Sequence, residues 1–313
     1  MSRLVVALSG GVGGAKLALG LSRVLPPEEL LVIANTGDDF EHLGLAISPD
    51  LDTLMYALAG LDNPATGWGR REESWSFMES IGALGGETWF RLGDRDLATH
   101  VERTRRLRAG ETLSAVTADF CRRLGIGPRI LPMSDDPVRT RVRTDEGWLD
   151  FQHWFVRLQC VPVVRGLAFE GADRARPQPA LMAALRDGGV RAVVICPSNP
   201  LISIEPILAV AGVREAIAGC GAPVLAVSPI IGGQAVKGPT AKMMRELGTE
   251  PGAAAVARRY GDLLQGYVMD HADAEQAAGL APRVVLARTL MQSLEDREAL
   301  ARTVLDLADT LRA

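Results

Sequence analysis

Apolar runs that do not alternate with polar residues recur along this chain, and each ends in a cluster of small or polar residues. The first run, LVVAL, occupies positions 4–8, and the second, LLVIA, occupies positions 30–34. Such runs are typical of strands that are buried on both faces of a parallel sheet. The amphipathic segment at 17–25 predicts a helix between them. The chain therefore opens with a strand–helix–strand unit.

The same pattern returns in the second half of the chain. Continuous apolar runs at 190–196 and 223–227 are each followed by a loop and a predicted helix. Two later strands are expected at 267–270 and 283–287, and a closing helix at 294–311. Strands that alternate with helices predict a Rossmann-like α/β fold with a mostly parallel sheet.

The middle of the chain does not keep this alternation. Apolar residues at helical spacing predict a helical block at 53–124. A strand near 130–133, a β-hairpin at 138–152 and a strand at 161–169 are expected after it. We therefore expect a single Rossmann-like catalytic domain over 1–313, with a helical and β-hairpin insertion at about 53–189.

Glycines and carboxylates follow the first two predicted strands. Positions 10–14 read GGVGG, positions 35–39 read NTGDD and positions 48–53 read SPDLDT. Glycines let backbone N–H groups approach an anion closely, and the helix that follows adds its positive end. Open α/β sheets bind ligands at the edge where these acidic residues fall. The pattern predicts a site for a metal-bridged phosphate ester; the alternative is a tight turn with solvated acids, Asp50 capping the next helix.

Two familiar glycine motifs do not fit. A Walker A loop needs Ser or Thr after its Gly-Lys pair, but Lys16 follows Ala15 and precedes Leu17. The dinucleotide fingerprint matches GVG at 11–13, yet Lys16 stands at its third small position. Because Asp38 can still act as the acid that binds a ribose, a nicotinamide-dependent enzyme remains an alternative.

Basic residues near position 100 are less specific. Arg91 and Arg95 flank a turn, where a guanidinium can bind phosphate or stack on a flat ring. The basic residues from Arg103 onward are expected on the solvated face of a helix. His100 is expected to be a structural residue rather than a catalyst.

The composition excludes several functional classes. The 313 residues carry a net charge of −4, which gives no reason to expect nucleic acid or an anionic membrane as partner. No apolar run approaches the roughly 20 residues of a membrane span, and the N-terminus lacks a signal-peptide pattern. The four cysteines lack Cys-x-x-Cys spacing, so they are expected to be thiols in a reducing compartment. We expect a cytoplasmic protein that acts on small molecules.

Seven motifs occur in the order in which a known family has them. They are GGVGG at 10–14, NTGDD at 35–39, SPDLDT at 48–53, LGDRDLATH at 92–100, LPMSD at 131–135, PSNP at 197–200 and SPIIG at 228–232. From the first strand to at least Gly238, the chain resembles the 2-phospho-L-lactate transferases of coenzyme F-420 biosynthesis. A related family of nucleotide-sugar-binding regulators shares the first two motifs but lacks SPDLDT and GDRDLATH, so the match favours the transferase.

The resemblance implies a reaction and a site. A 2-phospholactyl or phosphoenolpyruvyl group would move from a guanosine diphosphate ester (lactyl- or enolpyruvyl-diphospho-guanosine) to the terminal ribityl hydroxyl of the deazaflavin Fo. GMP would leave, Mg²⁺ would be required, and the protein would be a homodimer. The family pattern places Fo at Asp52 and Arg91. It places the guanosine nucleotide at Gly10, Gly11, Gly13, Gly14, Ser198, Asn199, Pro200, Ser228 and Gly232.

The chemistry of the acidic residues agrees with this implied reaction. Asp38 and Asp52, together with Asp39, offer hard oxygen ligands for Mg²⁺. Asp38 or Asp52 can also accept the proton of the attacking hydroxyl, as the catalytic carboxylate. The sequence does not separate these two roles, and it does not select among phospholactyl, phosphoenolpyruvyl and phosphoglyceryl donors. The main alternative function is a nucleotide-sugar-binding regulator without turnover.

Overall fold

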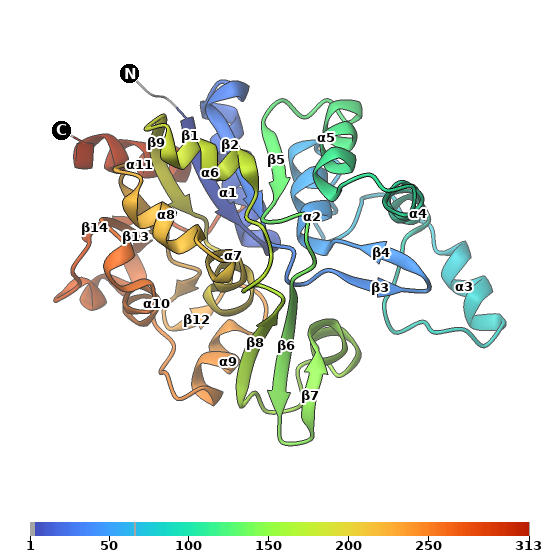
Figure 1. Cartoon of the computed structure of the whole chain (residues 1–313). Helices are drawn as coiled ribbons and strands as arrows, with labels where there is room; N and C mark the ends of the chain where they lie inside the picture. The colour runs from blue at the N-terminus through green and yellow to red at the C-terminus, as the bar shows by residue number, and fades with distance from the viewer. Residues whose placement is uncertain (1–3, 66, 313) are drawn as a thin grey trace.

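Seven parallel strands form the central sheet of the structure, a computed structural model that describes residues 4–65 and 67–312 (Figure 1). Their order across the sheet is β14-β13-β10-β9-β1-β2-β5, and every neighbouring pair is parallel. The predicted Rossmann-like α/β class is confirmed. The strands are β1 (Leu4–Ser9), β2 (Leu30–Ala34), β5 (Arg129–Pro132), β9 (Val190–Ile195), β10 (Val224–Val227), β13 (Gly266–Asp270) and β14 (Arg283–Ala287).

Helices cover both faces of this sheet. Successive residues of a strand point to opposite faces, so Val5 and Ala7 pack in one core while Val6 and Leu8 pack in the other. Because neither face of the inner strands meets water, these strands carry continuous apolar runs. The first core holds α1 (Gly11–Val24), α2 (Pro49–Leu58), α5 (Leu113–Arg123) and α11 (Leu294–Arg312). The second holds α6 (Pro179–Arg186), α7 (Glu205–Ala209), α8 (Val213–Gly219), α9 (Thr240–Glu246) and α10 (Ala253–Tyr260).

The order of the strands reverses beside β1. From β1 the chain moves to β2 and β5 on one side, and then returns to β9, β10, β13 and β14 on the other. In an open parallel sheet, a crevice for ligands lies outside the carboxyl ends of the strands at such a point. The loops that follow β1 and β9 flank this crevice.

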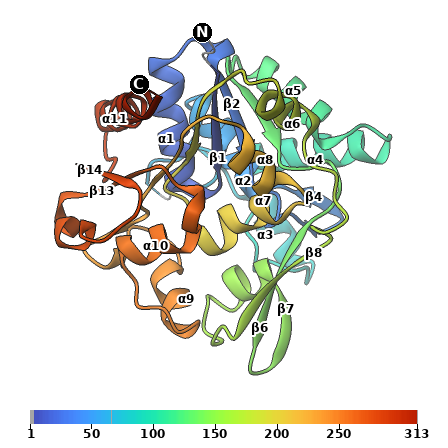
Figure 2. The same cartoon turned by 60° about the vertical axis from the view of Figure 1, so that its left-hand side comes forward.

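Two groups of elements lie outside the central sheet. The first surrounds a small core of Ile47, Met78 and Leu92 and contains β3 (Phe40–His42), β4 (Leu45–Ile47), α3 (Ser76–Ala83) and α4 (Asp94–Arg108). The second is an antiparallel sheet of β6 (Arg139–Thr144), β7 (Gly147–Asp150) and β8 (Gly166–Glu170), which extends at the bottom of Figure 2. The β6–β7 pair is the predicted hairpin. Along the chain, β5 lies between these two groups, and it joins the central sheet. The segment 53–189 is therefore not one continuous insertion.

Short elements complete the fold. π-Helical turns at His153–Arg157 and Pro200–Ile204 follow β7 and β9. A small hairpin of β11 (Ile230–Ile231) and β12 (Gln234–Ala235) follows β10, and 3₁₀ turns lie at Pro27–Glu29, Gly261–Leu263 and His271–Ala277. Among the helices described, none combines the length and the apolar character needed to cross a bilayer.

Candidate active site

A cavity of about 660 Å³ lies where the strand order reverses. Its walls include residues that follow four neighbouring strands: the glycine loop after β1, Asp38 after β2, Ser198 after β9 and Ser228 after β10. Further walls come from α2, from the segment 89–91, from the turn at 151–159 and from the C-terminal loop at 289–291. The cavity is therefore assembled from nearly the whole length of the chain.

The glycines after β1 allow two loops to approach each other. Helix α1 starts inside the glycine loop at Gly11, earlier than the predicted start at 17, and Gly11 has a φ of 64° that favours glycine. A Cβ atom at Gly13 would lie 2.3 Å from the carbonyl oxygen of Pro197. A Cβ atom at Gly14 would lie 2.4 Å from Ser198 Oγ. Larger residues here would push apart the loops after β1 and β9.

The backbone of the glycine loop is partly engaged within the protein. The N–H of Gly10 donates to Ser198 Oγ at 3.1 Å, and the N–H of Gly11 donates to Asp50 Oδ1 at 2.6 Å. The loop still lines the cavity, so the positive end of α1 faces its interior. This electrostatic environment favours an anionic ligand.

Lys16, one turn further along α1, also lines the cavity. Its Nζ donates to the carbonyl oxygen of Met291 at 2.8 Å, which joins α1 to the C-terminal loop. Burial lowers the pKa of Lys16, and the nearby charges of Arg297 and Lys237 lower it further. Positive charge thus gathers beside the glycine loop.

Asp50 joins the glycine loop to the acidic turn. Its Oδ2 accepts from Asn35 Nδ2 at 2.9 Å, while Asn35 Oδ1 accepts from the N–H of Gly37 at 2.8 Å. The alternative in which Asp50 caps α2 is wrong, because Ser48 is the N-cap residue and Asp50 lies within the first turn. The carboxylate of Asp50 instead bonds to two segments from elsewhere in the chain.

Asp38 and Asp39 face different surroundings. Asp38 lines the cavity, and its buried Oδ1 has no hydrogen-bond partner within residues 4–65 and 67–312. Burial, reinforced by the charge of Asp50, holds the pKa of Asp38 well above its usual range. Asp39 does not line the cavity; its Oδ2 accepts from Ser48 Oγ at 2.8 Å, and burial raises its pKa to about 7.

Asp38 and Asp50 together suit a divalent cation. Burial also raises the pKa of Asp50, to about 6. A raised pKa means that the protein alone stabilises the charged carboxylate poorly. A bound cation would stabilise that charge. Two carboxylates on one cavity wall, one with an unpartnered oxygen, are hard donors of the kind that Mg²⁺ binds.

Asp52 lies in the same cavity but is bound by Arg103. Arg103 Nη1 donates to Asp52 Oδ2 at 3.1 Å, and Nη2 donates to Asp52 Oδ1. The expectation that Arg103 lies on a solvated helix face is wrong, since its side chain is 1% exposed. A bidentate pair of this kind fixes the position of the carboxylate.

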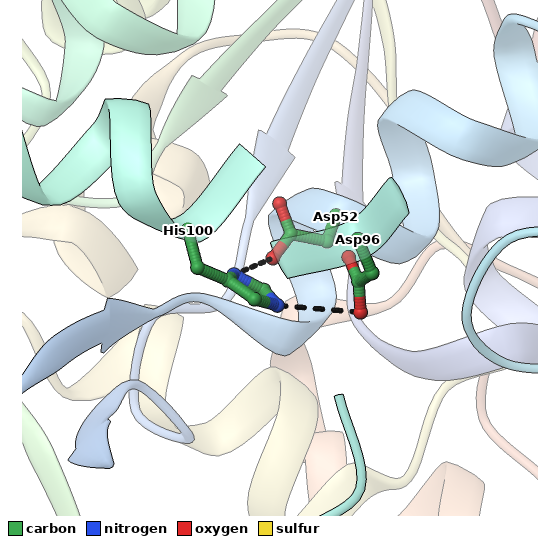
Figure 3. Close-up of side chains that lie close together, drawn as sticks. All are labelled: Asp52, Asp96 and His100. Carbon is green, nitrogen blue, oxygen red and sulfur yellow. Dashed lines mark ion pairs between the residues drawn. The ribbon is translucent and has the colours of Figure 1, made fainter. Parts of the chain in front are cut away.

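Asp52 also belongs to a compact group with Asp96 and His100 (Figure 3). His100 Nε2 lies 3.2 Å from Asp96 Oδ2, and His100 Nδ1 lies 3.7 Å from Asp52 Oδ2. The three residues offer ligand atoms within 4.8 Å of one another, the spacing of a metal site. A cation at this position would lie beside the guanidinium of Arg103, which already binds both oxygens of Asp52. The donor set at Asp38 and Asp50 therefore suits a cation better.

Aromatic side chains line another part of the cavity. The rings of Phe151 and Phe155 stack with centroids 5.2 Å apart, and both line the cavity with Trp68, Trp89 and Phe90. Large flat rings that line a cavity favour a planar ligand. Arg91 lies at this wall, with its guanidinium carbon 4.0 Å from the centroid of the Trp75 ring.

The cavity brings together most of the residues that the sequence singles out. Those lining it are Gly10, Gly11, Gly13, Asp38, Asp52, Arg91, Ser198, Asn199 and Ser228. Gly14, Asp39, Pro200 and Gly232 are not among its lining residues. Gly14 packs against Ser198, while the N–H of Gly232 donates to Asp273 at 3.0 Å.

Sequence reasoning missed several residues of the site. Arg103 was assigned to solvent because it stands among other arginines of α4, and only its burial distinguishes it. Asn35 lies inside the NTGDD motif at 35–39, and its position directly after a strand is a signal that the sequence does contain. Phe151 and Gln152 follow a hairpin whose sequence does not mark them as site residues. Both line the cavity, and the side-chain amide of Gln152 donates to the carbonyl oxygen of Asp38 at 3.1 Å.

Comparison with known proteins identifies the family. The family model described as 2-phospho-L-lactate transferase CofD matches residues 5–293. The chain belongs to this transferase family. It is 43% identical to a phosphoenolpyruvate transferase of Streptomyces griseus over 99% of both chains, and 46% identical to one of Kitasatospora aureofaciens over 98% of both.

A solved structure supports the fold alone. A UPF0052-family protein of Bacillus halodurans superimposes with a TM-score of 0.64 over 97% of this chain and 99% of its own. The sequence identity is 13%. This likeness confirms the Rossmann-like architecture and carries no argument about activity.

Proposed function

We propose that this protein is a Mg²⁺-dependent transferase that moves a phosphoenolpyruvyl or 2-phospholactyl group from a guanosine diphosphate ester to the deazaflavin Fo in the biosynthesis of coenzyme F-420. The observation that carries the proposal is one cavity in which an anion-binding helix terminus and a pair of buried carboxylates face an aromatic wall. Membership of the transferase family supports it. The relatives' names favour enolpyruvyl-diphospho-guanosine as the donor.

The donor binds beside the glycine loop in this proposal. Its diphosphate lies at the start of α1, and the nucleotide extends along the loops that contain Ser198 and Ser228. Asp38 and Asp50 hold the Mg²⁺, which neutralises phosphate charge when bound. Lys16 adds positive charge on the same side of the cavity.

The acceptor binds at the aromatic wall. Arg91 contacts the deazaflavin, and Asp52 accepts a hydrogen bond from the ribityl hydroxyl. The hydroxyl oxygen forms a new bond to the phosphorus that carries the acid fragment, the phosphoanhydride bond breaks, and GMP leaves. Asp38 and Asp52 are the carboxylates that can accept the hydroxyl proton. Positioning and charge neutralisation supply most of the acceleration in such transfers.

The test is direct transfer. The purified protein is incubated with Fo, Mg²⁺ and either lactyl-, enolpyruvyl- or glyceryl-diphospho-guanosine, and the deazaflavin is examined by mass spectrometry. We expect a mass increase equal to the phospho-acid fragment, fastest with the enolpyruvyl donor, together with one GMP per product. Tight binding of a UDP-sugar without any transfer would favour the nucleotide-sugar regulator instead. Light scattering of the same sample tests the homodimer.

A further inference from the structure

A network of hydrogen bonds and ion-pair contacts surrounds Asp52. Beyond the two bonds from Arg103, Nη1 of Arg103 lies 3.3 Å from His100 Nδ1. His100 Nε2 lies 3.2 Å from Asp96 Oδ2, and Asp96 Oδ1 accepts from the hydroxyl of Tyr56 at 2.6 Å. The Tyr56, Asp96 and His100 side chains all line the cavity with Asp52.

The contact between Arg103 and His100 indicates which ring nitrogen of His100 can carry the hydrogen. A guanidinium has only N–H groups, so His100 Nδ1 must be the acceptor from Arg103. The hydrogen of the imidazole then resides on Nε2, which lies 3.2 Å from Asp96 Oδ2 without forming a hydrogen bond of good geometry. Asp96 therefore accepts a hydrogen bond from Tyr56 and lies within ion-pair distance of His100, while Asp52 accepts two hydrogen bonds from Arg103.

We propose that Arg103, His100, Asp96 and Tyr56 are positioning residues that reserve Asp52 for the acceptor hydroxyl, and that the divalent cation is held by Asp38 and Asp50 without Asp52. This inference rests on the proposed function. It divides the acidic residues of the cavity into a cation side and an acceptor side.

Charge and coordination support this division. A bidentate guanidinium neutralises Asp52, and a cation would have to displace it from both carboxylate oxygens. Asp38 has no guanidinium partner, and its Oδ1 is unpartnered in the part of the chain that the structure describes. A buried ion pair with a purely structural role would not need three neighbouring polar side chains, those of Tyr56, Asp96 and His100, to line a ligand cavity.

The first variant for the test is Arg103→Lys, which keeps the charge but loses the two-pronged contact. Acceptor affinity is measured by deazaflavin fluorescence, and the Mg²⁺ concentration for half-maximal turnover is measured at saturating acceptor. Since charged hydrogen bonds contribute about 1.5–3 kcal/mol, we expect roughly ten- to a hundredfold weaker acceptor binding. The Mg²⁺ requirement and the donor KM should stay within about twofold of wild type.

Three further variants complete the design. Tyr56→Phe removes only a hydroxyl and should weaken acceptor binding by a few fold, again without changing the Mg²⁺ requirement. Asp38→Asn should do the reverse, raising the Mg²⁺ requirement and sparing acceptor affinity. Arg106→Lys is the matched control, since Arg106 is an ion-paired arginine of the same helix, 2.7 Å from Asp119 and absent from the cavity wall.

Defined outcomes overturn the inference. A raised Mg²⁺ requirement in Arg103→Lys or Tyr56→Phe would make Asp52 a cation ligand. Equal losses of donor and acceptor binding in the folded variants would reduce the network to a structural role. If Arg103→Lys fails to fold, Tyr56→Phe and His100→Gln are used to test the inference. Acceptor affinity and the Mg²⁺ concentration for half-maximal turnover are measured for both variants. Wild-type protein that transfers nothing to Fo would instead overturn the proposed function.

Discussion

Asp38, Asp50 and Asp52 in the cavity and Asp39 beside it differ in what surrounds them, although all four belong to one short stretch of sequence. Asp52 is paired with Arg103, and Asp39 accepts from Ser48. Asp38 instead lies near Asp50, whose negative charge helps to raise the pKa of Asp38. These partners, more than the residue type, decide which chemistry each aspartate can perform.

Asp38→Asn tests the role of the least satisfied carboxylate. An amide keeps the shape of the side chain but loses the charge that Mg²⁺ binding needs. We expect an unchanged circular dichroism spectrum and turnover lowered by roughly a hundredfold, because a metal ion contributes several kcal/mol of charge stabilisation. Normal turnover at limiting Mg²⁺ would show that Asp38 is not a ligand.

The raised pKa values predict how stability depends on pH. An unfolded Asp has a pKa of about 3.9, whereas burial raises the pKa of Asp39 to about 7 and that of Asp50 to about 6. The folded protein therefore retains protons that the unfolded chain has lost. The free energy of unfolding should fall as the pH rises from 5 to 8 without Mg²⁺.

The decrease should amount to a few kcal/mol, since one pKa unit corresponds to about 1.4 kcal/mol. Urea titrations at pH 5.5 and 8, with and without Mg²⁺, measure it. Mg²⁺ should stabilise the protein more at pH 8 than at pH 5.5. Asp50→Asn should flatten the pH dependence, and a stability that rises with pH in the absence of Mg²⁺ would contradict the assignment.

Arg91 provides a test of acceptor binding at the cavity wall. Arg91→Ala should weaken Fo binding by roughly ten- to a hundredfold, as expected for a lost charged hydrogen bond, and leave GDP affinity nearly unchanged. Fluorescence titration with Fo and calorimetry with GDP measure the two affinities. Arg95→Ala is the control, because Arg95 pairs with Glu72 at 3.2 Å and does not line the cavity. Equal weakening of both ligands would remove Arg91 from the acceptor site.

Among the elements, the junction of the loops after β1 and β9 is the most constrained. Gly13→Ala would place a Cβ atom 2.3 Å from the backbone oxygen of Pro197, which no side-chain movement can relieve. We expect a loss of about 1–3 kcal/mol in stability together with weaker nucleotide binding. Thermal and urea unfolding measure the change.

A second glycine supplies the matched control. Gly219 ends α8, and a Cβ atom there would meet no atom within 4 Å. Gly219→Ala should stabilise the protein slightly, by up to about 1 kcal/mol, because alanine is the better helix former. If Gly13→Ala behaves like Gly219→Ala, the close approach of the two loops is not a constraint.

For the whole molecule, the arrangement of the sheet predicts the class of ligand. The cavity lies at the reversal of strand order, the position at which parallel α/β sheets bind nucleotides. We expect calorimetry to show binding of GDP in preference to UDP-sugars or NAD. Tight UDP-sugar binding without GDP binding would favour a regulator, and tight NAD binding would favour an oxidoreductase.

The sequence by itself determined the sheet strands, the loops at their carboxyl ends and the class of fold. These features depend on local periodicity and on residues that stand next to each other, so they can be interpreted without knowing the path of the chain. The β3–β4 hairpin was missed because its strands are three residues long, too short for a period to show.

Only the tertiary structure decided the partners. Asp52 and Arg103 are 51 positions apart, and Gly10 and Ser198 are 188 apart. No local pattern predicts which guanidinium of α4 will be buried, because the burial of Arg103 depends on Asp52 of α2 and Ala46 of β4 coming to lie against it. The sequence thus placed the acidic residues at one edge of the sheet, and the packing of distant segments gave each of them its charge environment.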